Sequence, residues 1–213
     1  MTQTNSVSAP MRILVVDDHP IVRVGIAAII QARADMAVVG QAGTGEEAIA
    51  LHQNHDPDLT LMDLRLPDMS GVQVIRRIRD RSSRARFVVL TTYEGDEDIH
   101  QALTAGAQGY LIKGMPHEFL IDAIRKVHGG HRFLPPPVSR ALASRVPEAE
   151  LSSREREVLA LLVKGKSNKQ IAALLQISEP TVKSHVSAIL MRLDVADRTQ
   201  AVVTALQRGL AHL

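Results

Sequence analysis

Five short apolar runs recur between Arg12 and Val127, and a segment with helical spacing follows each of them. The runs are Ile13–Val16, Val38–Ala42, Leu59–Met62, Phe87–Leu90 and Tyr110–Ile112. Each run is too short for a helix and is apolar on both faces, which is typical of buried strands. Between the runs, apolar residues recur about every 3.6 positions. One such set is Ile21, Val24, Ile26 and Ile29. This alternation predicts an α/β fold with a doubly wound, five-stranded parallel sheet that helices cover on both faces.

The composition is that of an ordinary globular protein. Of the 213 residues, 45% are hydrophobic and 23% are charged, so two modest cores are expected. The absence of cysteine excludes disulfides and zinc sites made of thiolates. Met1 to Pro10 lack the apolar run of a signal peptide, and no later segment has the roughly 18 apolar residues of a membrane helix. We therefore expect a cytoplasmic protein that begins with a loose polar tail and has no membrane partner.

The strand and helix pattern ends at Gly129 and Gly130, and the run Pro135–Pro137 follows. Proline fixes φ and lacks an amide donor, which opposes regular structure. We therefore predict a first domain at residues 11–130, a linker at 131–148 and a second domain at 149–213. Within the linker, Val138–Val146 has the spacing of a short helix.

Every periodic segment of the second domain has helical spacing and begins with a helix-start pattern. These patterns are capping boxes at Ser152–Glu155 and Asp197–Gln200, Ser167 ahead of a helical segment, and Pro180 in a first turn. A small all-α domain of four helices is therefore predicted. Its 9 Lys and Arg against 6 Asp and Glu give +3, whereas residues 1–130, with 13 against 16, carry −3. This asymmetry favours different partners for the two domains.

The chemically reactive residues of the first domain all follow predicted strands: Asp17 and Asp18 the first, Asp63 the third, Thr91 the fourth and Lys113 the fifth. Ligands bind at the carboxyl ends of parallel strands. In the order 2-1-3-4-5 of flavodoxin-like sheets, the first and third strands are neighbours, so the three carboxylates would converge. Such a group requires a hard dication, and Mg²⁺ suits it. A carboxylate there can attack phosphorus, while Lys113 stabilises the phosphoryl charge and Thr91 donates a hydrogen bond.

Taken alone, each of these residues also suits a solvated turn, a loop cap or an exposed lysine. Thr92 adjoins Thr91, and only one of two adjacent strand hydroxyls points into the crevice. His19 lacks a partner at metal-ligand spacing and is interpreted as a surface histidine. The placement of the whole set at strand ends favours the functional interpretation.

Over residues 12–130 the chain resembles the receiver domain of bacterial two-component systems. The matching motifs are Val15–Pro20, Asp63–Gly71, Leu90–Tyr93 and Gly109–Lys113. The resemblance implies that Asp63 accepts a phosphoryl group from a sensor histidine kinase. It also implies a Mg²⁺ site formed by Asp63, Asp18, the Arg65 carbonyl and, through water, Asp17. Thr91 and Tyr110 would be the switch pair, and Lys113 the phosphate-binding lysine. Gly114 departs from the acidic residue that often follows this lysine.

Residues 165–186 have the pattern of a helix, a short turn and a second helix. Five apolar residues of the second helix share one side and are predicted to pack inward: Val182, Val186, Ile189, Leu190 and Leu193. Lys183, Ser184 and Ser187 then point away, and such a helix fits the DNA major groove. Lys183 would reach guanine or phosphate, with Ser184 or His185 as a further contact. Charge alone equally allows a helical protein-interaction module.

From Leu151 to about Leu206 the chain resembles the LuxR-type helix-turn-helix of NarL/FixJ response regulators. The resemblance implies a recognition helix at Glu179–Leu193 and a dimerisation helix at Asp197–Gln207. The candidate DNA contacts are Lys169, Thr181, Lys183, Ser184, His185, Ser187 and Arg192. Many relatives have a second lysine at the position of Ser187, so phosphate affinity would depend on the remaining cations.

Together these expectations describe a DNA-binding transcriptional response regulator that is switched by phosphorylation of Asp63 and acts as a homodimer on double-stranded DNA. It is not expected to be an enzyme. One alternative is a phosphorylation-independent DNA-binding regulator with a vestigial receiver. Another is an aspartate-nucleophile phosphatase of the dehalogenase type. That class expects an acid two residues after the nucleophile, where this chain has Arg65.

Overall fold

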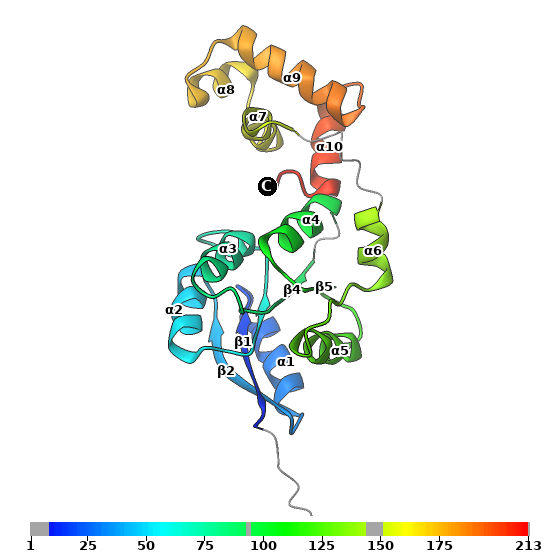
Figure 1. Cartoon of the computed structure of the whole chain (residues 1–213). Coiled ribbons are helices and arrows are strands. Elements are labelled where there is room, and N and C mark those ends of the chain that lie inside the picture. The colour runs from blue at the N-terminus through cyan, green and yellow to red at the C-terminus, as the bar shows by residue number, and fades with distance from the viewer. Residues whose placement is uncertain (1–8, 93–94, 144–150, 213) are drawn as a thin grey trace, which may run out of the picture. The chain divides into compact units, whose positions relative to one another are not determined.

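The computed structural model describes residues 9–92, 95–143 and 151–212, which form two compact units (Figure 1). The first unit is built on a five-stranded sheet in the order β2-β1-β3-β4-β5, and all neighbouring strands are parallel. The strands are β1 (Met11–Val16), β2 (Met36–Ala42), β3 (Leu59–Met62), β4 (Phe87–Thr91) and β5 (Gly109–Ile112). The predicted doubly wound sheet and its strand order are confirmed.

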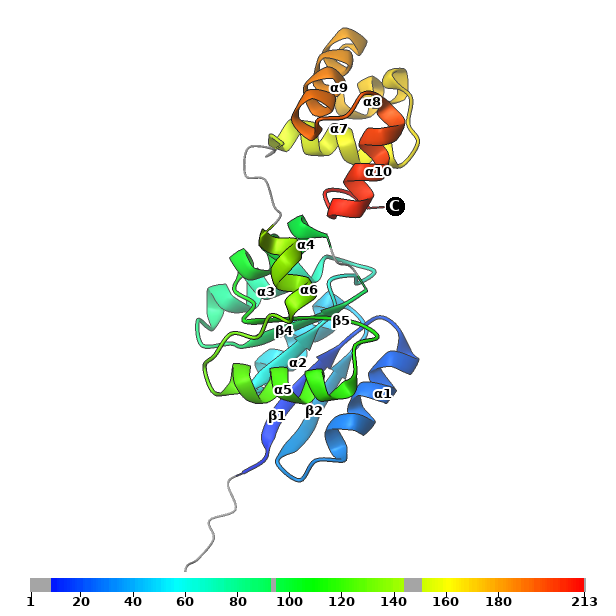
Figure 2. The same ribbon diagram turned by 90° about the vertical axis from the view of Figure 1, so that its right-hand side faces the viewer.

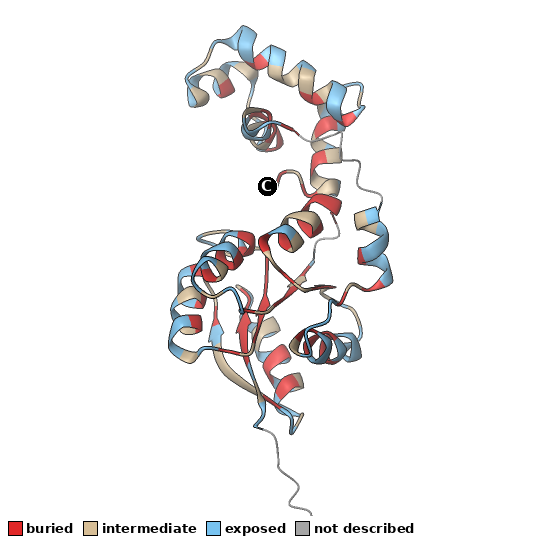
Figure 3. Ribbon diagram, in the orientation of Figure 1, coloured by how far each residue is buried: buried red, intermediate tan, exposed pale blue. Residues whose placement is uncertain are grey.

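Helices lie on both faces of this sheet (Figures 1 and 2). The helices that follow the strands are α1 (Pro20–Gln31), α2 (Gly45–His55), α3 (Gly71–Arg81), α4 (Asp96–Ala105) and α5 (His117–His128). Residues of α1 and α5 pack into one core cluster with Leu59 and Leu61 of β3. On the opposite face of the sheet lie α2 and α3 (Figures 1 and 2). Helices on both faces bury the strands from two sides, and β3 is buried along its whole length (Figure 3).

The apolar residues whose spacing indicated helix α1 do not all face inward. Ile26 and Ile30 are buried, but Ile21 is 87% exposed and Val24 is 65% exposed. α1 carries apolar residues almost all round, so several helical sides have the same apolar spacing. The packing of α1 against β1 and β2, which the spacing cannot reveal, decides which side is buried.

The second unit contains the four helices predicted for the C-terminal domain. They are α7 (Ser153–Val163), α8 (Asn168–Leu175), α9 (Glu179–Leu193) and α10 (Arg198–Arg208). A serine or aspartate caps each helix, and Ser152 and Ser167 form full capping boxes. Their apolar sides meet in a separate core cluster that includes Val158, Ile171 and Ile189. Within the described ranges, none of the helices is both long enough and apolar enough to cross a membrane.

The segment after residue 130 is more ordered than predicted. Phe133 packs into the core of the first unit, where its amide donates to the Gln108 carbonyl (3.0 Å) and its carbonyl accepts from the Tyr110 amide (3.1 Å). α6 (Pro136–Ala143) then begins at the second proline of the run, so the expectation that this run opposes regular structure was wrong. Prolines in a first helical turn have no amide hydrogen bond to lose. The helix starts two residues before the predicted Val138, and residues 144–146 of that prediction lie outside the described ranges.

His52 of α2 is a buried histidine on the face of the sheet that α2 covers. The residue is 5% exposed, and its ring stacks on Phe87 of β4 with centroids 6.3 Å apart. Burial lowers the pKa of His52, and the negative charge of Asp56 opposes this only in part. The folded chain therefore keeps this ring neutral at pH values where an exposed histidine begins to take up a proton.

We expect the protein to lose stability as the pH falls below about 6.5, the ordinary histidine pKa, because the unfolded chain then binds a proton that folded His52 does not. The loss ends at the folded pKa, and its slope is at most about 1.4 kcal/mol per pH unit. Urea unfolding between about pH 5.5 and 7.5 should show a smaller slope in His52→Leu than in the wild type. His131→Gln, which alters an exposed histidine, should keep the wild-type slope. Equal slopes in all three proteins would contradict the assignment.

Candidate functional site

Strand pairing brings buried acids together at the carboxyl edge of the sheet. β1 and β3 are neighbours, and their register pairs Val16 with Met62, the last residue of each strand. The residues that follow, Asp17 and Asp63, therefore lie side by side, at 1% and 2% exposure. The Asp63 amide donates to the Val16 carbonyl (2.9 Å), which continues the ladder by one step. The predicted convergence of acids from distant strand ends is thus observed for these two.

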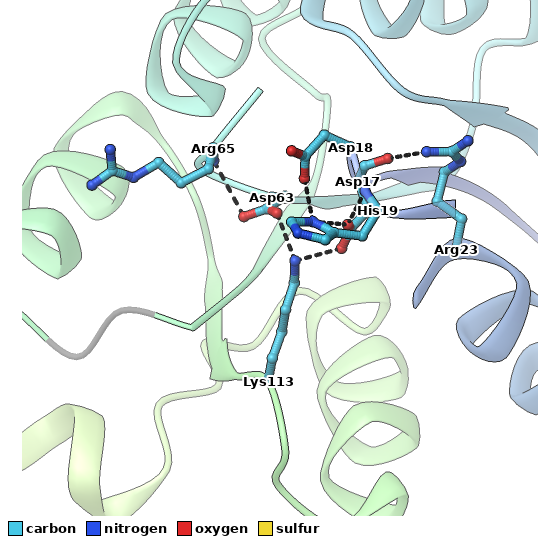
Figure 4. A network of polar contacts seen from close by, with 7 residues as sticks. All are labelled: Asp17, Asp18, His19, Arg23, Asp63, Arg65 and Lys113. Carbon is cyan, nitrogen blue, oxygen red and sulfur yellow. Dashed lines mark hydrogen bonds and ion pairs between the residues drawn. The ribbon is translucent and has the colours of Figure 1, made fainter. Parts of the chain in front are cut away.

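Lys113 follows β5 and reaches both of these carboxylates (Figure 4). Its Nζ lies 2.6 Å from Oδ2 of Asp17 and 2.6 Å from Oδ2 of Asp63. The Lys113 amide donates to the Thr91 carbonyl (2.7 Å), which fixes the base of the side chain at the end of the β4–β5 ladder. One ammonium therefore connects the ends of β1, β3 and β5.

Burial and charge act in opposite directions on this group. Burial raises the pKa of Asp63, and the hydrogen bond and charge of Lys113 offset only part of that effect. For Lys113, burial acts to lower the pKa, but hydrogen bonds and charges from Asp17 and Asp63 outweigh it and the pKa is raised. Lys113 is therefore a stable cation, whereas the negative charge on Asp63 still favours a further positive group nearby.

Asp18 and His19 complete a group of possible cation ligands. One ligand atom each from Asp17, Asp18, His19 and Asp63 lies within 4.8 Å of the others. Lys113 supplies one positive charge against three carboxylates, so a net charge of about −2 remains if all are ionised. Carboxylate oxygens are the ligands that Mg²⁺ prefers. The chemistry of this donor set therefore fits Mg²⁺.

His19 was not expected in this group. Its side chain is 67% exposed, as a surface histidine should be, yet Nδ1 lies 2.5 Å from Oδ1 of Asp18. Arg23 of α1 was missed as well: its guanidinium donates to the Asp17 carbonyl. Arg23 lies one helical turn after His19. The start of a helix at this point in the sequence was therefore the signal that could have revealed its contact with the Asp17 backbone. Arg23 thus holds the backbone at Asp17, and the His19 ring contacts the Asp18 carboxylate.

Thr91 is the hydroxyl that turns inward at the end of β4. It is fully buried while Thr92 is exposed, which resolves the ambiguity between the two residues. Among the residues that the structure describes, Oγ1 of Thr91 has no hydrogen-bond partner. An unpartnered buried hydroxyl is costly, so this oxygen is suited to bind a ligand atom. Tyr110 of β5, the other predicted switch residue, is fully buried.

The connection after Asp63 places the Arg65 backbone beside the pocket. The Arg65 amide donates to Oδ1 of Asp63 (3.2 Å). The Arg65 side chain extends away from the acids (Figure 4). Only the backbone of Arg65 is therefore suited to act in the pocket, as its predicted carbonyl ligand requires.

The second candidate site is the exposed side of α9. Val182, Ile189 and Leu193 are buried, as the predicted inward side requires. Of the seven predicted DNA contacts, His185 is half-buried and the other six are exposed: Lys169, Thr181, Lys183, Ser184, Ser187 and Arg192. Thr181 and Ser178 share a hydroxyl hydrogen bond (2.7 Å) at the helix start. The first turns of α9 thus present small polar groups and one lysine to solvent.

Arg192 has a partner inside the second unit. Its Nε lies 3.3 Å from Oε1 of Glu155, which is 5% exposed and also accepts from the Ser152 amide (2.7 Å). Burial acts to raise the pKa of Glu155, but the Ser152 hydrogen bonds and the Arg192 charge outweigh it and the pKa is lowered. This ion pair joins α7 to α9. Arg192 therefore has a structural role beside its predicted DNA contact.

Comparison with protein families gives a match to each unit. Residues 13–125 match the response regulator receiver domain, and residues 149–205 match the luxR family of bacterial regulatory proteins. The chain is a LuxR-family response regulator. The predicted family, fold and general function of this response regulator are confirmed: it is a two-component, DNA-binding transcriptional regulator.

Relatives of this response regulator match it over nearly its whole length. The response regulator protein VraR of Staphylococcus aureus is 40% identical over 205 residues, which are 94% of this chain and 98% of VraR. The crystal structure of ChrA, from a heme-sensing two-component system, is 38% identical, covers 95% of this chain and 100% of ChrA, and has a TM-score of 0.58. RcsB of Salmonella enterica serovar Typhimurium, bound to promoter DNA with the phosphomimetic BeF₃⁻, is 26% identical. The match covers 92% of this chain and 98% of RcsB, with a TM-score of 0.70.

If the acids hold Mg²⁺, the ion should raise the thermal unfolding midpoint of this response regulator, because the unfolded chain does not bring the acids together. At 100 times its dissociation constant, the ion should stabilise the fold by about 2.7 kcal/mol. Asp18→Asn should unfold at a higher temperature than the wild type without Mg²⁺, since fewer acids then repel one another, and should gain little from the ion. Asp122→Asn, on the exposed side of α5, should behave as the wild type. An equal response in all three proteins would contradict this site.

Proposed function

We propose that a partner histidine kinase phosphorylates this response regulator at Asp63. The main support for this proposal is the buried Asp63 carboxylate, which follows β3 and has Lys113 Nζ 2.6 Å from its Oδ2. In the transfer, an Asp63 oxygen forms a bond to phosphorus while the bond from phosphorus to the donor histidine nitrogen breaks. The product is an acyl phosphate on Asp63.

Mg²⁺ is proposed to bind Asp18, Asp63 and the Arg65 carbonyl, with Asp17 acting through water. When bound, the ion supplies positive charge that stabilises the phosphoryl oxygens. Lys113, which follows β5, supplies a second positive charge. The excess of three carboxylates over one ammonium supports this assignment.

Thr91, Tyr110 and Lys113 are proposed to sense the phosphoryl group, which adds about −1.5 to −2 charges at Asp63. Lys113 pairs with the new oxygens, and the Thr91 hydroxyl, without a partner among the described residues, donates a hydrogen bond to one of them. Thr91 moves toward the group and Tyr110 adjusts with it. This rearrangement alters the surface of the receiver and shifts the population toward a DNA-binding state.

The start of α9 is proposed to enter the major groove of double-stranded DNA. Contacts to bases and phosphates would come from Lys169, Thr181, Lys183, Ser184, His185, Ser187 and Arg192. A homodimer would place two such helices on paired half-sites, with α10 as the dimer contact. Its exposed Val203, at 47%, suits that role. A solved structure of RcsB that holds two dimers on two DNAs supports the arrangement by similarity, at 27% identity.

The domain ranges and the absence of an enzymatic role are also proposed. We assign residues 11–130 to the receiver, 131–148 to the linker and 149–213 to the DNA-binding domain, although Phe133 of the linker packs with the receiver.

The family consists of DNA-binding transcription regulators, and we infer that this member acts in the cytoplasm and is not an enzyme. Arg65, where a phosphatase of the dehalogenase type has an acid, argues against that alternative.

DNA selection from random duplexes, with and without a small acyl phosphate donor and Mg²⁺, tests the proposed switch. The phosphodonor should tighten binding of the wild type to the selected duplex by about 5- to 150-fold, the usual range of allosteric coupling. Asp63→Asn, which keeps the shape of the side chain but cannot form an acyl phosphate, should bind DNA without responding to the donor. An equal gain in Asp63→Asn would place the switch elsewhere. A wild type that binds equally with and without donor would favour a vestigial receiver.

A further inference from the structure

Asp68 connects the loop after Asp63 to the start of helix α2. It lies between β3 and α3, and its carboxylate accepts two backbone hydrogen bonds from the first turn of α2. Oδ1 accepts from the Gly45 amide (2.8 Å) and Oδ2 accepts from the Glu46 amide (3.0 Å). One side chain thus joins two segments that are more than twenty residues apart in the sequence.

These two hydrogen bonds complete the cap of α2. The first amides of a helix have no partner within the helix. Thr44 accepts a hydrogen bond from the Glu47 amide (3.2 Å), and Asp68 accepts hydrogen bonds from the two preceding amides, those of Gly45 and Glu46. A carboxylate at a helix start is favoured by the helix dipole, and charge-assisted hydrogen bonds of this kind are the stronger ones. The hydrogen bonds from Gly45 and Glu46 accordingly lower the pKa of Asp68.

The loop and α2 also pack so closely that no side chain would fit at Gly45. A Cβ on Gly45 would lie 2.4 Å from Cγ of Met69, the residue after Asp68. At the other end of the loop, the Gly71 amide donates to the Leu64 carbonyl (2.9 Å), and a Cβ on Gly71 would lie 2.1 Å from the Asp63 carbonyl oxygen. The loop is therefore closed at its base by Gly71 and held at its tip by Asp68.

We propose that Asp68 is a positioning residue for the phosphoryl-accepting pocket: by tying the loop to α2, it holds the backbone of residues 63–65 in place for the metal ion. This inference rests on the proposed function, because that loop carries both Asp63 and the Arg65 carbonyl. Among the residues that the structure describes, the Asp68 side chain makes no hydrogen bond or ion pair with the acids or with Lys113; its hydrogen bonds go to α2. Its effect on the pocket is exerted through the backbone.

Groups that orient metal ligands from outside typically change metal affinity 10- to 100-fold when they are removed. The expected loss for Asp68→Ala falls in this range, because the tip of the loop then loses both hydrogen bonds to α2 and is held there by the packing of Met69 alone. Asp68→Asn keeps one carbonyl oxygen and so one of the two hydrogen bonds. Its affinity should lie between those of Asp68→Ala and the wild type.

Thr44→Ala provides the matched control. It removes the other cap of the same helix turn, so both Thr44→Ala and Asp68→Ala should lower the thermal midpoint. Thr44, however, accepts its hydrogen bond from within that turn, whereas the hydrogen bonds of Asp68 join the turn to the loop. A merely structural role would therefore make the two variants alike in metal affinity, and a positioning role would separate them.

The test is a Mn²⁺ titration of the full chain, followed by the loss of the free-ion electron paramagnetic resonance signal, with Mg²⁺ as competitor. Mn²⁺ suits the same oxygen ligands. The expected result is wild-type affinity in Thr44→Ala, a 10- to 100-fold loss in Asp68→Ala and a smaller loss in Asp68→Asn. Wild-type affinity in Asp68→Ala, or an equal loss in Thr44→Ala, would overturn the inference while leaving the pocket intact. Failure of the wild type itself to bind Mn²⁺ would overturn the proposed metal pocket and this inference with it.

Discussion

The contact on which the receiver depends is that of Lys113 with two buried acids. Asp17 and Asp63 lie side by side because β1 pairs with β3, and burying two like charges is unfavourable without a cation between them. Lys113 can supply that cation only because β4 and β5 extend the sheet to bring its Nζ within 2.6 Å of both. The strand order, the burial and the charges of the pocket therefore depend on one another.

The strands and the C-terminal helices were readable from the sequence because their patterns are local. Leu59–Met62 was predicted with the bounds that β3 has, and the capping box at Ser152 follows from residues three positions apart. The buried side of α1 was not readable, since apolar residues surround that helix and the sheet selects among them. α6 was also misjudged, because proline opposes the interior of a helix but not its first turn.

The members of the pocket could be predicted, but not all of their contacts. Asp17, Asp63, Thr91 and Lys113 stand directly after strands or at their ends, so parallel topology alone brings them to one edge. The approach of His19 to Asp18, and the choice between Thr91 and Thr92, depend on side-chain direction at strand ends, where alternation no longer fixes it. The Glu155–Arg192 ion pair likewise joins two helices whose crossing no spacing in the sequence specifies.

Mass spectrometry of the intact chain after treatment with acetyl phosphate and Mg²⁺ shows whether this acidic edge accepts a covalent phosphate. We expect one phosphoryl adduct per chain, which hydroxylamine removes and borohydride reduction locates at Asp63, and no adduct when the metal is chelated. An adduct on another residue, or no adduct under conditions in which Mg²⁺ is bound, would contradict this expectation.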